Sequence, residues 1–476
     1  MDENKRIKKK LLRITWPIFV ESLLLSTLGT VDILMVSRYS DSAVAAVGVS
    51  NQIINMINLL FVVITSGTSI LVAQYIGANR DGKRNNELVQ LCGMSIGFNT
   101  LIGLLLSLVL SCFGIGFLKL LNTSNDILYL ANDFLKYVGG FIFIQAISMT
   151  ITAILRPYGY VKICMYVTLL VNVINAILNY ILIFGKFGAP ELGVVGSALG
   201  TAISKFIGLC ILAVVIYVKI LRGHSIKLLW PLPFKHLKNV MTIGIPSAGE
   251  NMSYSLAQLA LMSFINTISV ETVTTRSYVN NIVSFAVLFS AALAQGNGII
   301  VGRLIGEKKN GAALNFGMYS IKIAILLSTG MAGLFAIFGH PLMRIFTENQ
   351  EIIKLGAIVI GIDVILEIGR ATNVVGIGAL KAVGDVKFPV VIGIFSMWII
   401  SVGLGYVLSI KCGLGLIGIW IGLASDECFR AILVIFRWKS RKWESTSSRC
   451  PISAKASRKS NSSPGTSRWA TPSSRT

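Results

Sequence analysis

Ionisable side chains interrupt the long apolar runs of this sequence, and they are the residues most able to bind ions or transfer protons. Asp32 lies in the run TLGTVDILMV, with no basic residue within one helical turn. A charge inside a membrane span is costly, so such a residue calls for a function or a partner. Burial favours the protonated form of a carboxyl group. We therefore predict that Asp32 carries a proton or coordinates Na⁺; a structural hydrogen bond to a neighbouring helix is the alternative.

A row of asparagines offers polar partners for Asp32. Asn172, Asn175 and Asn179 are spaced three and four residues apart, which places them on one face of a helix. This face predicts a hydrogen-bond or cation network with Asp32, to which Thr201 is a secondary candidate. The alternative is that the asparagines are polar contacts between helices, which membrane helices use commonly.

Two glutamates each follow a proline by four residues. Glu21 follows Pro17 and Glu250 follows Pro246, and Glu250 has no basic neighbour in the sequence. A proline frees a backbone carbonyl and bends the helix. We predict a cation or proton role for both glutamates, with a cavity-lining or inter-helix hydrogen bond as the alternative.

Two charged clusters lie in the last third of the chain, and each occupies one face of a helix. They consist of Asp363, Glu367, Arg370, Asp426, Glu427 and Arg430. An arginine in such a place is more often an ion-pair partner than a transport site. We predict a structural ion-pair network between the two helices. The surplus carboxylates, Asp363 and Glu367, are secondary candidates for a cation site.

The elements that carry these residues are predicted to be membrane helices. The 476 residues are 54% apolar and 13% charged, with a mean hydropathy of +0.73. The charged share is about half that of soluble domains, and disorder needs low hydrophobicity. Spans of about 20 residues predict an all-α polytopic membrane protein of twelve transmembrane helices. The predicted spans are 14–37, 43–76, 88–116, 127–154, 163–184, 193–218, 242–268, 276–301, 314–338, 351–378, 388–409 and 416–437.

The basic residues set the predicted topology. The net charge is +22, but Lys and Arg gather at the chain ends and in alternate loops, which indicates that both termini are cytoplasmic and favours a bilayer over nucleic acid as the partner. We predict a cytoplasmic N-terminus (1–13), an N-lobe (14–218), an inter-lobe loop (219–241), a C-lobe (242–440) and a disordered, basic, Ser-rich tail (441–476).

The two predicted lobes are related by an internal repeat. At an offset of 229, Pro17 and Glu21 coincide with Pro246 and Glu250. At an offset of 225, further matches are Leu155 with Leu380, Gly159 with Gly384, Lys162 with Lys387 and Lys205 with Arg430. Because each copy holds six helices, both run through the bilayer in the same sense. They are predicted to be related by an axis along the membrane normal, as in transporters.

Enzyme signatures are missing from the sequence. The three histidines do not cluster, and no Walker A motif occurs. We therefore predict neither an enzyme nor direct use of ATP, and no cofactor beyond a coupling ion. A Na⁺ site is not assigned to particular residues.

Several segments resemble the multidrug and toxic compound extrusion (MATE) family, and the resemblance covers about residues 14–440. They are LVAQYIGANRDG (71–82) and its repeat GRLIGEKKNG (302–311), ILRPYGYVK (154–162) and its repeat ALKAVGDVKFP (379–389), and NYILIFGKFGAPELGVVGSALGTAIS (179–204). The resemblance implies a monomeric exporter of the bacterial plasma membrane, with two six-helix lobes in a V. It also implies export of cationic, amphipathic small molecules in exchange for H⁺ or Na⁺.

The resemblance assigns individual residues as well. Asp32 matches the family's helix 1 aspartate, and Asn175 matches an asparagine of its N-lobe network. Asn179 stands where some members have a second aspartate, and Arg370 stands where the family's helix 10 acid falls. The alternative function is a lipid-linked oligosaccharide flippase of the same superfamily, which usually has more spans and a more basic cavity. A channel is disfavoured by the parallel repeat.

Overall fold

The chain folds into a bundle of long helices. The computed structural model describes residues 3–79, 85–121, 123–222 and 234–440, and these residues contain no strand. Its first part, here called the N half, comprises α1 (Glu3–Ser37), α2 (Asp41–Ala78), α3 (Asn85–Leu120), α4 (Asn125–Gly140), α5 (Ile142–Tyr158), α6 (Val161–Phe184), η1 (Lys186–Gly188), α7 (Gly193–Ile216) and η2 (Tyr217–Leu221).

The second part, here called the C half, repeats this order. It comprises α8 (Phe234–Asn266), α9 (Val270–Gly306), α10 (Asn310–Ile337), α11 (Gly339–Arg344), α12 (Gln350–Ala382), α13 (Lys387–Ser396), η4 (Met397–Leu404), η5 (Val407–Lys411) and α14 (Gly415–Lys439). η2, η4 and η5 are π-helical turns that continue the helices before them.

All twelve predicted spans are helical, with one notable difference. The predicted span 127–154 is two helices, α4 and α5, which meet at Phe141 with a bend of 43°. Gly139 and Gly140 precede the break, and glycine weakens a helix at this point. At the loop between the halves, α8 already begins at Phe234, inside the predicted loop 219–241. Residues 223–233 of that loop and the predicted tail 441–476 lie outside the described residues.

Composition separates the spans into two groups. Within the described ranges, eight helices are long and apolar enough to cross a membrane, and the bent pair α4–α5 makes a ninth. The other three long helices are α8, α12 and α14, which carry Glu250 and the two charged clusters. α12 packs against α9, α10 and α14, so other helices surround its charges. The fold is thus the expected polytopic bundle, whose most polar helices lie in the C half.

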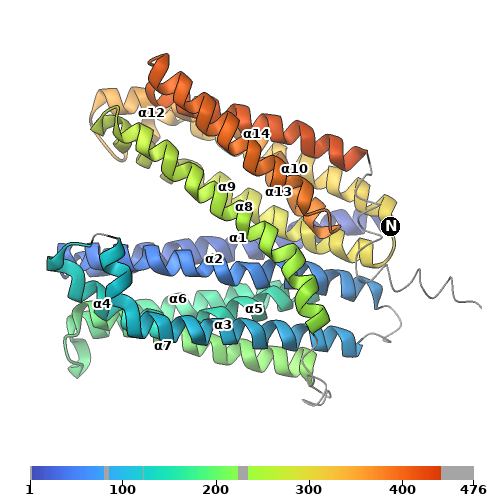
Figure 1. Ribbon diagram of the computed structural model, residues 1–476, viewed down its shortest axis with the longest axis horizontal. Helices are drawn as coiled ribbons and strands as arrows, with labels where there is room; N and C mark the ends of the chain where they lie inside the picture. The colour runs from blue at the N-terminus through green and yellow to red at the C-terminus, as the bar shows by residue number, and fades with distance from the viewer. Residues whose placement is uncertain (1–2, 80–84, 122, 223–233, 441–476) are drawn as a thin grey trace, which may run out of the picture.

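The two halves form a V (Figure 1). They meet at the end where α1 begins and spread apart towards the opposite end. Most contacts between the halves are made by α1 and α2 on one side and by α8 and α9 on the other, and α3, α10 and α12 contribute fewer. An apolar cluster crosses the junction, with Leu11 and Ile18 of α1 packed together with Ile299 and Ile300 of α9.

The junction of the halves, here called the closed end, depends on close backbone contact. Gly77 lies directly against the carbonyl of Arg303, and Gly244 against the carbonyl of Val63, so a Cβ atom at either glycine would collide with backbone. Gln74 Nε2 also donates a hydrogen bond of 2.8 Å to the carbonyl of Ala382 in α12. Because these contacts join the halves at one end only, the V is open at the other.

Candidate functional site

A polar network in the N half brings four predicted residues together. Asn179 Nδ2 donates to Asp32 Oδ1 at 2.6 Å and to Asn175 Oδ1 at 3.2 Å. Asn175 Nδ2 donates in turn to Thr201 Oγ1 at 3.2 Å. This N-half network therefore joins α1, α6 and α7 through a single line of hydrogen bonds. Asn172, one turn earlier on α6, instead donates to the carbonyl of Leu24 at 2.6 Å.

The N-half network leaves oxygen atoms available for a ligand. Asn175 and Asn179 are fully buried, and Asn179 Oδ1 has no hydrogen-bond partner. Buried polar atoms are normally satisfied, so an orphaned carbonyl oxygen calls for an explanation. A carboxylate, an amide oxygen and a hydroxyl are groups that accept a proton or coordinate a hard cation. The network has the chemistry that the sequence predicted for Asp32 and its neighbours.

Lys205 lies one turn beyond Thr201 on α7 and was not predicted as a site residue. Its charge interacts with that of Asp32. It also lines the large cavity described below. Within the described part of the chain, its amino group makes no hydrogen bond and no ion pair. The sequence did carry a signal, since a lysine inside an apolar helix is costly.

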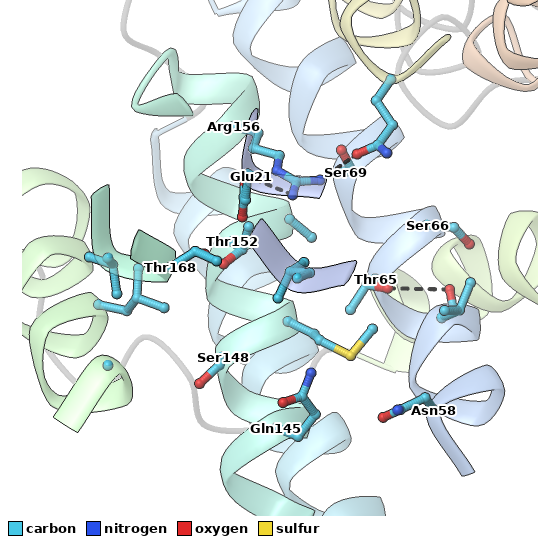
Figure 2. Close-up of a pocket in the computed structure, with 18 of the residues that line it drawn as sticks. Glu21, Asn58, Thr65, Ser66, Ser69, Gln145, Ser148, Thr152, Arg156 and Thr168 are labelled. Carbon is cyan, nitrogen blue, oxygen red and sulfur yellow. Dashed lines mark hydrogen bonds and ion pairs between the residues drawn. The ribbon is translucent and has the colours of Figure 1, made fainter. Parts of the chain in front are cut away.

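A cavity of about 620 Å³ lies beside this network, lined by α1, α2, α5, α6, α7, α9 and α12. Its volume is in the range of sites for drug-sized ligands. Figure 2 shows polar side chains facing it from α2, including Asn58 and Ser66, and from α5, including Gln145 and Ser148. Because α9 and α12 contribute to its wall, both halves contact any occupant.

Glu21 lines this cavity and is ion-paired. Arg156 Nη2 of α5 lies 3.0 Å from Glu21 Oε2, and only 4% of the Glu21 side chain is exposed. Arg156 also donates to Gln295 of α9 in the C half. Figure 2 shows this group at one end of the cavity. Glu21 is thus part of the junction between the halves as well as a cavity residue.

Glu250 has a basic partner after all. Lys381 Nζ of α12 lies 2.7 Å from Glu250 Oε2. No partner is visible near Glu250 in the sequence because Lys381 is 131 residues away. The offset of 225 that relates Leu155 to Leu380 also relates Arg156 to Lys381. The same glutamate–base pair therefore occurs once in each half.

The charged residues of α12 and α14 form ion pairs within each helix, whereas the sequence predicted ion pairs between the two helices. Arg370 Nη1 lies 2.5 Å from Glu367 Oε1 within α12. Arg430 Nη2 lies 2.8 Å from Asp426 Oδ2 and 2.9 Å from Glu427 Oε1 within α14. Both arginines are thus held by acids of their own helix.

Further hydrogen bonds join these helices to each other and to α13. Asn373 Nδ2 of α12 donates to Glu427 Oε2 at 2.7 Å, and Ser396 of α13 donates to Asp426. Trp420 Nε1 of α14 donates to Asp363 Oδ1 at 3.2 Å. The polar cluster therefore fixes three helices of the C half relative to one another.

The C-half cluster contains more acids than bases. Asp363, Glu367, Asp426 and Glu427 face only two arginines, and both Asp363 Oδ2 and Glu367 Oε2 are buried without a partner. These two carboxyl groups remain secondary candidates for a cation. The described residues hold no group of three or more His, Cys, Asp or Glu side chains arranged to bind a metal ion.

The internal repeat agrees with what known proteins show. The MatE family model matches twice, at residues 17–181 and 246–407, so its second match begins 229 residues after the first. The chain belongs to the MATE family. It is 41% identical to the uncharacterized transporter YisQ of Bacillus subtilis, over 91% of this chain and 94% of that protein.

Two further comparisons support this membership. The chain is 28% identical to the probable multidrug resistance protein NorM of Thermotoga maritima, over 93% of this chain and 94% of that protein. Its fold matches a crystal structure of MATE in the bent conformation with a TM-score of 0.84 at 20% identity, over 94% of this chain and all of that one. The protein is a multi-pass membrane transporter of the MATE multidrug efflux family. The comparisons do not favour a flippase and indicate no catalytic activity.

Proposed function

We propose that the protein is a secondary active exporter of cationic, amphipathic small molecules in the bacterial plasma membrane. Export would be driven by H⁺ or Na⁺ entering in exchange. The observation that carries this proposal is the N-half network, beside a cavity lined by both halves. In it, Asp32 accepts a hydrogen bond from Asn179, whose own amide oxygen is buried without a partner. Relatives named as probable multidrug resistance proteins support the export of drugs.

Alternating access follows from how the halves meet. The closed end is held by glycine contacts and a few hydrogen bonds, whereas the other end of the V is open. We place the closed end at the cytoplasm, as the loop charges predict, so this conformation faces outward. Rocking of the halves around the cavity would open the opposite side, as in transporters built from repeats.

Competition between the coupling cation and the substrate at Asp32 would couple the transport of one to the transport of the other. A ligand shifts a conformational equilibrium only through its different affinity for the two states. A coupling cation on Asp32 cancels the negative charge that attracts a cationic substrate. One site would thus hold the cation and the substrate in turn, and each occupant would be released on the opposite side.

Counterflow in proteoliposomes tests this function. A fluorescent cationic dye is loaded, and a pH gradient or a Na⁺ gradient is imposed in separate runs. We expect one gradient to drive dye movement and the Asp32→Asn variant to abolish it. The matched control is Asp133→Asn on the exposed face of α4, which should transport like the wild type. Dye movement that no gradient alters, or full activity of Asp32→Asn, would contradict the proposal.

A further inference from the structure

The cavity contains one basic residue without a nearby partner, and this bears on what it binds. Its ionisable lining residues are Glu21, Arg156, Lys205 and Lys381. Arg156 pairs with Glu21 and Lys381 pairs with Glu250. These pairs leave Lys205 as the one ionisable residue, among the described lining residues, that has no ion-pair partner in contact. A plain organic cation would meet a positive charge there.

The internal repeat shows what Lys205 lacks. At the offset of 225, Lys205 corresponds to Arg430, whose guanidinium is held by Asp426 and Glu427. The positions that correspond to those two acids are Thr201 and Ala202. The basic residue is thus present in both halves, but its local acids are present only in the C half.

Asp32 is the acid that offsets Lys205, and it is not in direct contact with it. Their charges interact, but the hydrogen bond of 2.6 Å from Asn179 holds Asp32 Oδ1. In a site of low dielectric, adding a single charge to a balanced pair is costly unless it is compensated. A ligand with both a positive and a negative group adds no net charge. It replaces the distant attraction between Asp32 and Lys205 by two close attractions, one to each residue.

We propose that Lys205 is the binding subsite for an acidic group of the substrate. The substrate class is therefore zwitterionic amphiphiles, which carry an amine or other cation together with a carboxylate or similar acid. The acid faces Lys205, and the cation lies towards Asp32, which is outside the cavity lining and whose charge interacts with that of Lys205. Gln145, which borders the cavity beside Lys205, is placed to donate a second hydrogen bond to the acid. This inference rests on the proposed export function and specifies its substrate.

A pair of dyes that differ in one group tests the proposal. Rhodamine 110 has a free carboxylate, and rhodamine 123 is its methyl ester and hence a cation. Binding to the purified full-length protein is measured by fluorescence anisotropy, without any gradient. We expect the wild type to bind the free acid about tenfold more tightly than the ester, as one close charge pair would give.

Variants of Lys205 separate recognition from packing. Lys205→Gln should weaken binding of the acid about tenfold and leave binding of the ester unchanged or stronger, whereas Lys205→Arg should keep the preference for the acid. The matched control is Lys322→Gln on the exposed face of α10, which should bind both dyes like the wild type. Equal weakening of both dyes by Lys205→Gln, or a wild-type preference for the ester, would overturn the proposal.

The same variants distinguish this proposal from the proposed function. A preference for the acid that depends on Lys205 supports the subsite even if no gradient drives transport. Gradient-driven transport of the ester with no role for Lys205 supports the exporter and overturns the subsite.

Discussion

The N half and the C half each contain the same glutamate–base ion pair, but their remaining charged residues differ in whether they have partners. Glu21 with Arg156 and Glu250 with Lys381 are the same pair at repeat-related positions. In the C half, Arg430 is held by two acids of its own helix. In the N half, Lys205 has no such neighbour, and its acid, Asp32, is held by asparagine. The C half thus pairs its arginines within their own helices, whereas the N half leaves Lys205 without a contact partner, as the proposed ligand site requires.

Duplication explains how this difference can arise. Each copy has the same helices, and the shared ion pair joins α1 to α5 in one copy and α8 to α12 in the other. Once one copy supplies enough buried ion pairs to fix its helices, the other copy is free to lose local partners. A buried charge without a partner is costly, so an unpaired lysine and an orphaned amide oxygen are expected where a ligand supplies what is missing.

The largest expected effect comes from breaking the buried cluster of α14. Arg430→Met leaves Asp426 and Glu427 as uncompensated buried charges, and we expect it to lower the free energy of unfolding by about 3–5 kcal/mol. Lys205→Met removes the repeat-related base, which has no close partner, and should change the free energy of unfolding by less than about 1 kcal/mol. Denaturant unfolding of both variants in the same detergent measures the difference. Equal losses would show that the halves do not differ in this respect.

A smaller effect is expected at the shared ion pair. Arg156→Met leaves Glu21 buried and removes the hydrogen bond to Gln295, so we expect a loss of about 2–3 kcal/mol. The double variant Glu21→Gln/Arg156→Met should recover part of this loss, because no lone charge remains. Thermal unfolding of the single and double variants measures the coupling. A double variant less stable than Arg156→Met would mean that Glu21 is not stabilised mainly by its arginine.

The smallest effect concerns the junction rather than either half. Gly244→Ala places a methyl group against the carbonyl of Val63, and overpacking of this kind costs about 1–3 kcal/mol. The substitution should therefore favour conformations in which the two halves are separated at the closed end. Gly97→Ala is the control, because a Cβ atom at Gly97 has no heavy atom within 4 Å.

Maleimide labelling of a cysteine introduced at Ala382 reports that opening. Ala382 is fully buried at the closed end, so labelling requires separation of the halves. In a background without the native cysteines, we expect Gly244→Ala to label about 5–150 times faster than the parent, which is the range that 1–3 kcal/mol gives. Unchanged labelling by Gly244→Ala, or equal acceleration by Gly97→Ala, would argue against a closed end held by glycine packing.

Much of the fold was predictable because the membrane constrains helices strongly. Length and hydropathy predicted all twelve helical segments. The asparagine face of α6 supplies Asn179, which contacts Asp32, whereas Asn172 bonds the carbonyl of Leu24 instead. The bend at Phe141 was missed, because two glycines permit a break without dictating one.

The long-range partners were missed because they come from distant helices. Glu250 had no basic neighbour in the sequence, yet Lys381 lies against it in space. The repeat contained a usable signal, since the offsets of 229 and 225 relate Glu21 with Arg156 to Glu250 with Lys381. The same comparison would have singled out Lys205, whose repeat partner keeps two acids that Lys205 lacks.

The most direct test asks which half gives up its cation when substrate binds. Proton release into a weakly buffered solution and release of ²²Na⁺ are measured as a saturating dye is added to the purified protein. The wild type should release one of these ions, Asp32→Asn should release neither, and Asp363→Asn should release it like the wild type. Loss of the release in Asp363→Asn, with release intact in Asp32→Asn, would place the exchange site in the C half and contradict the account.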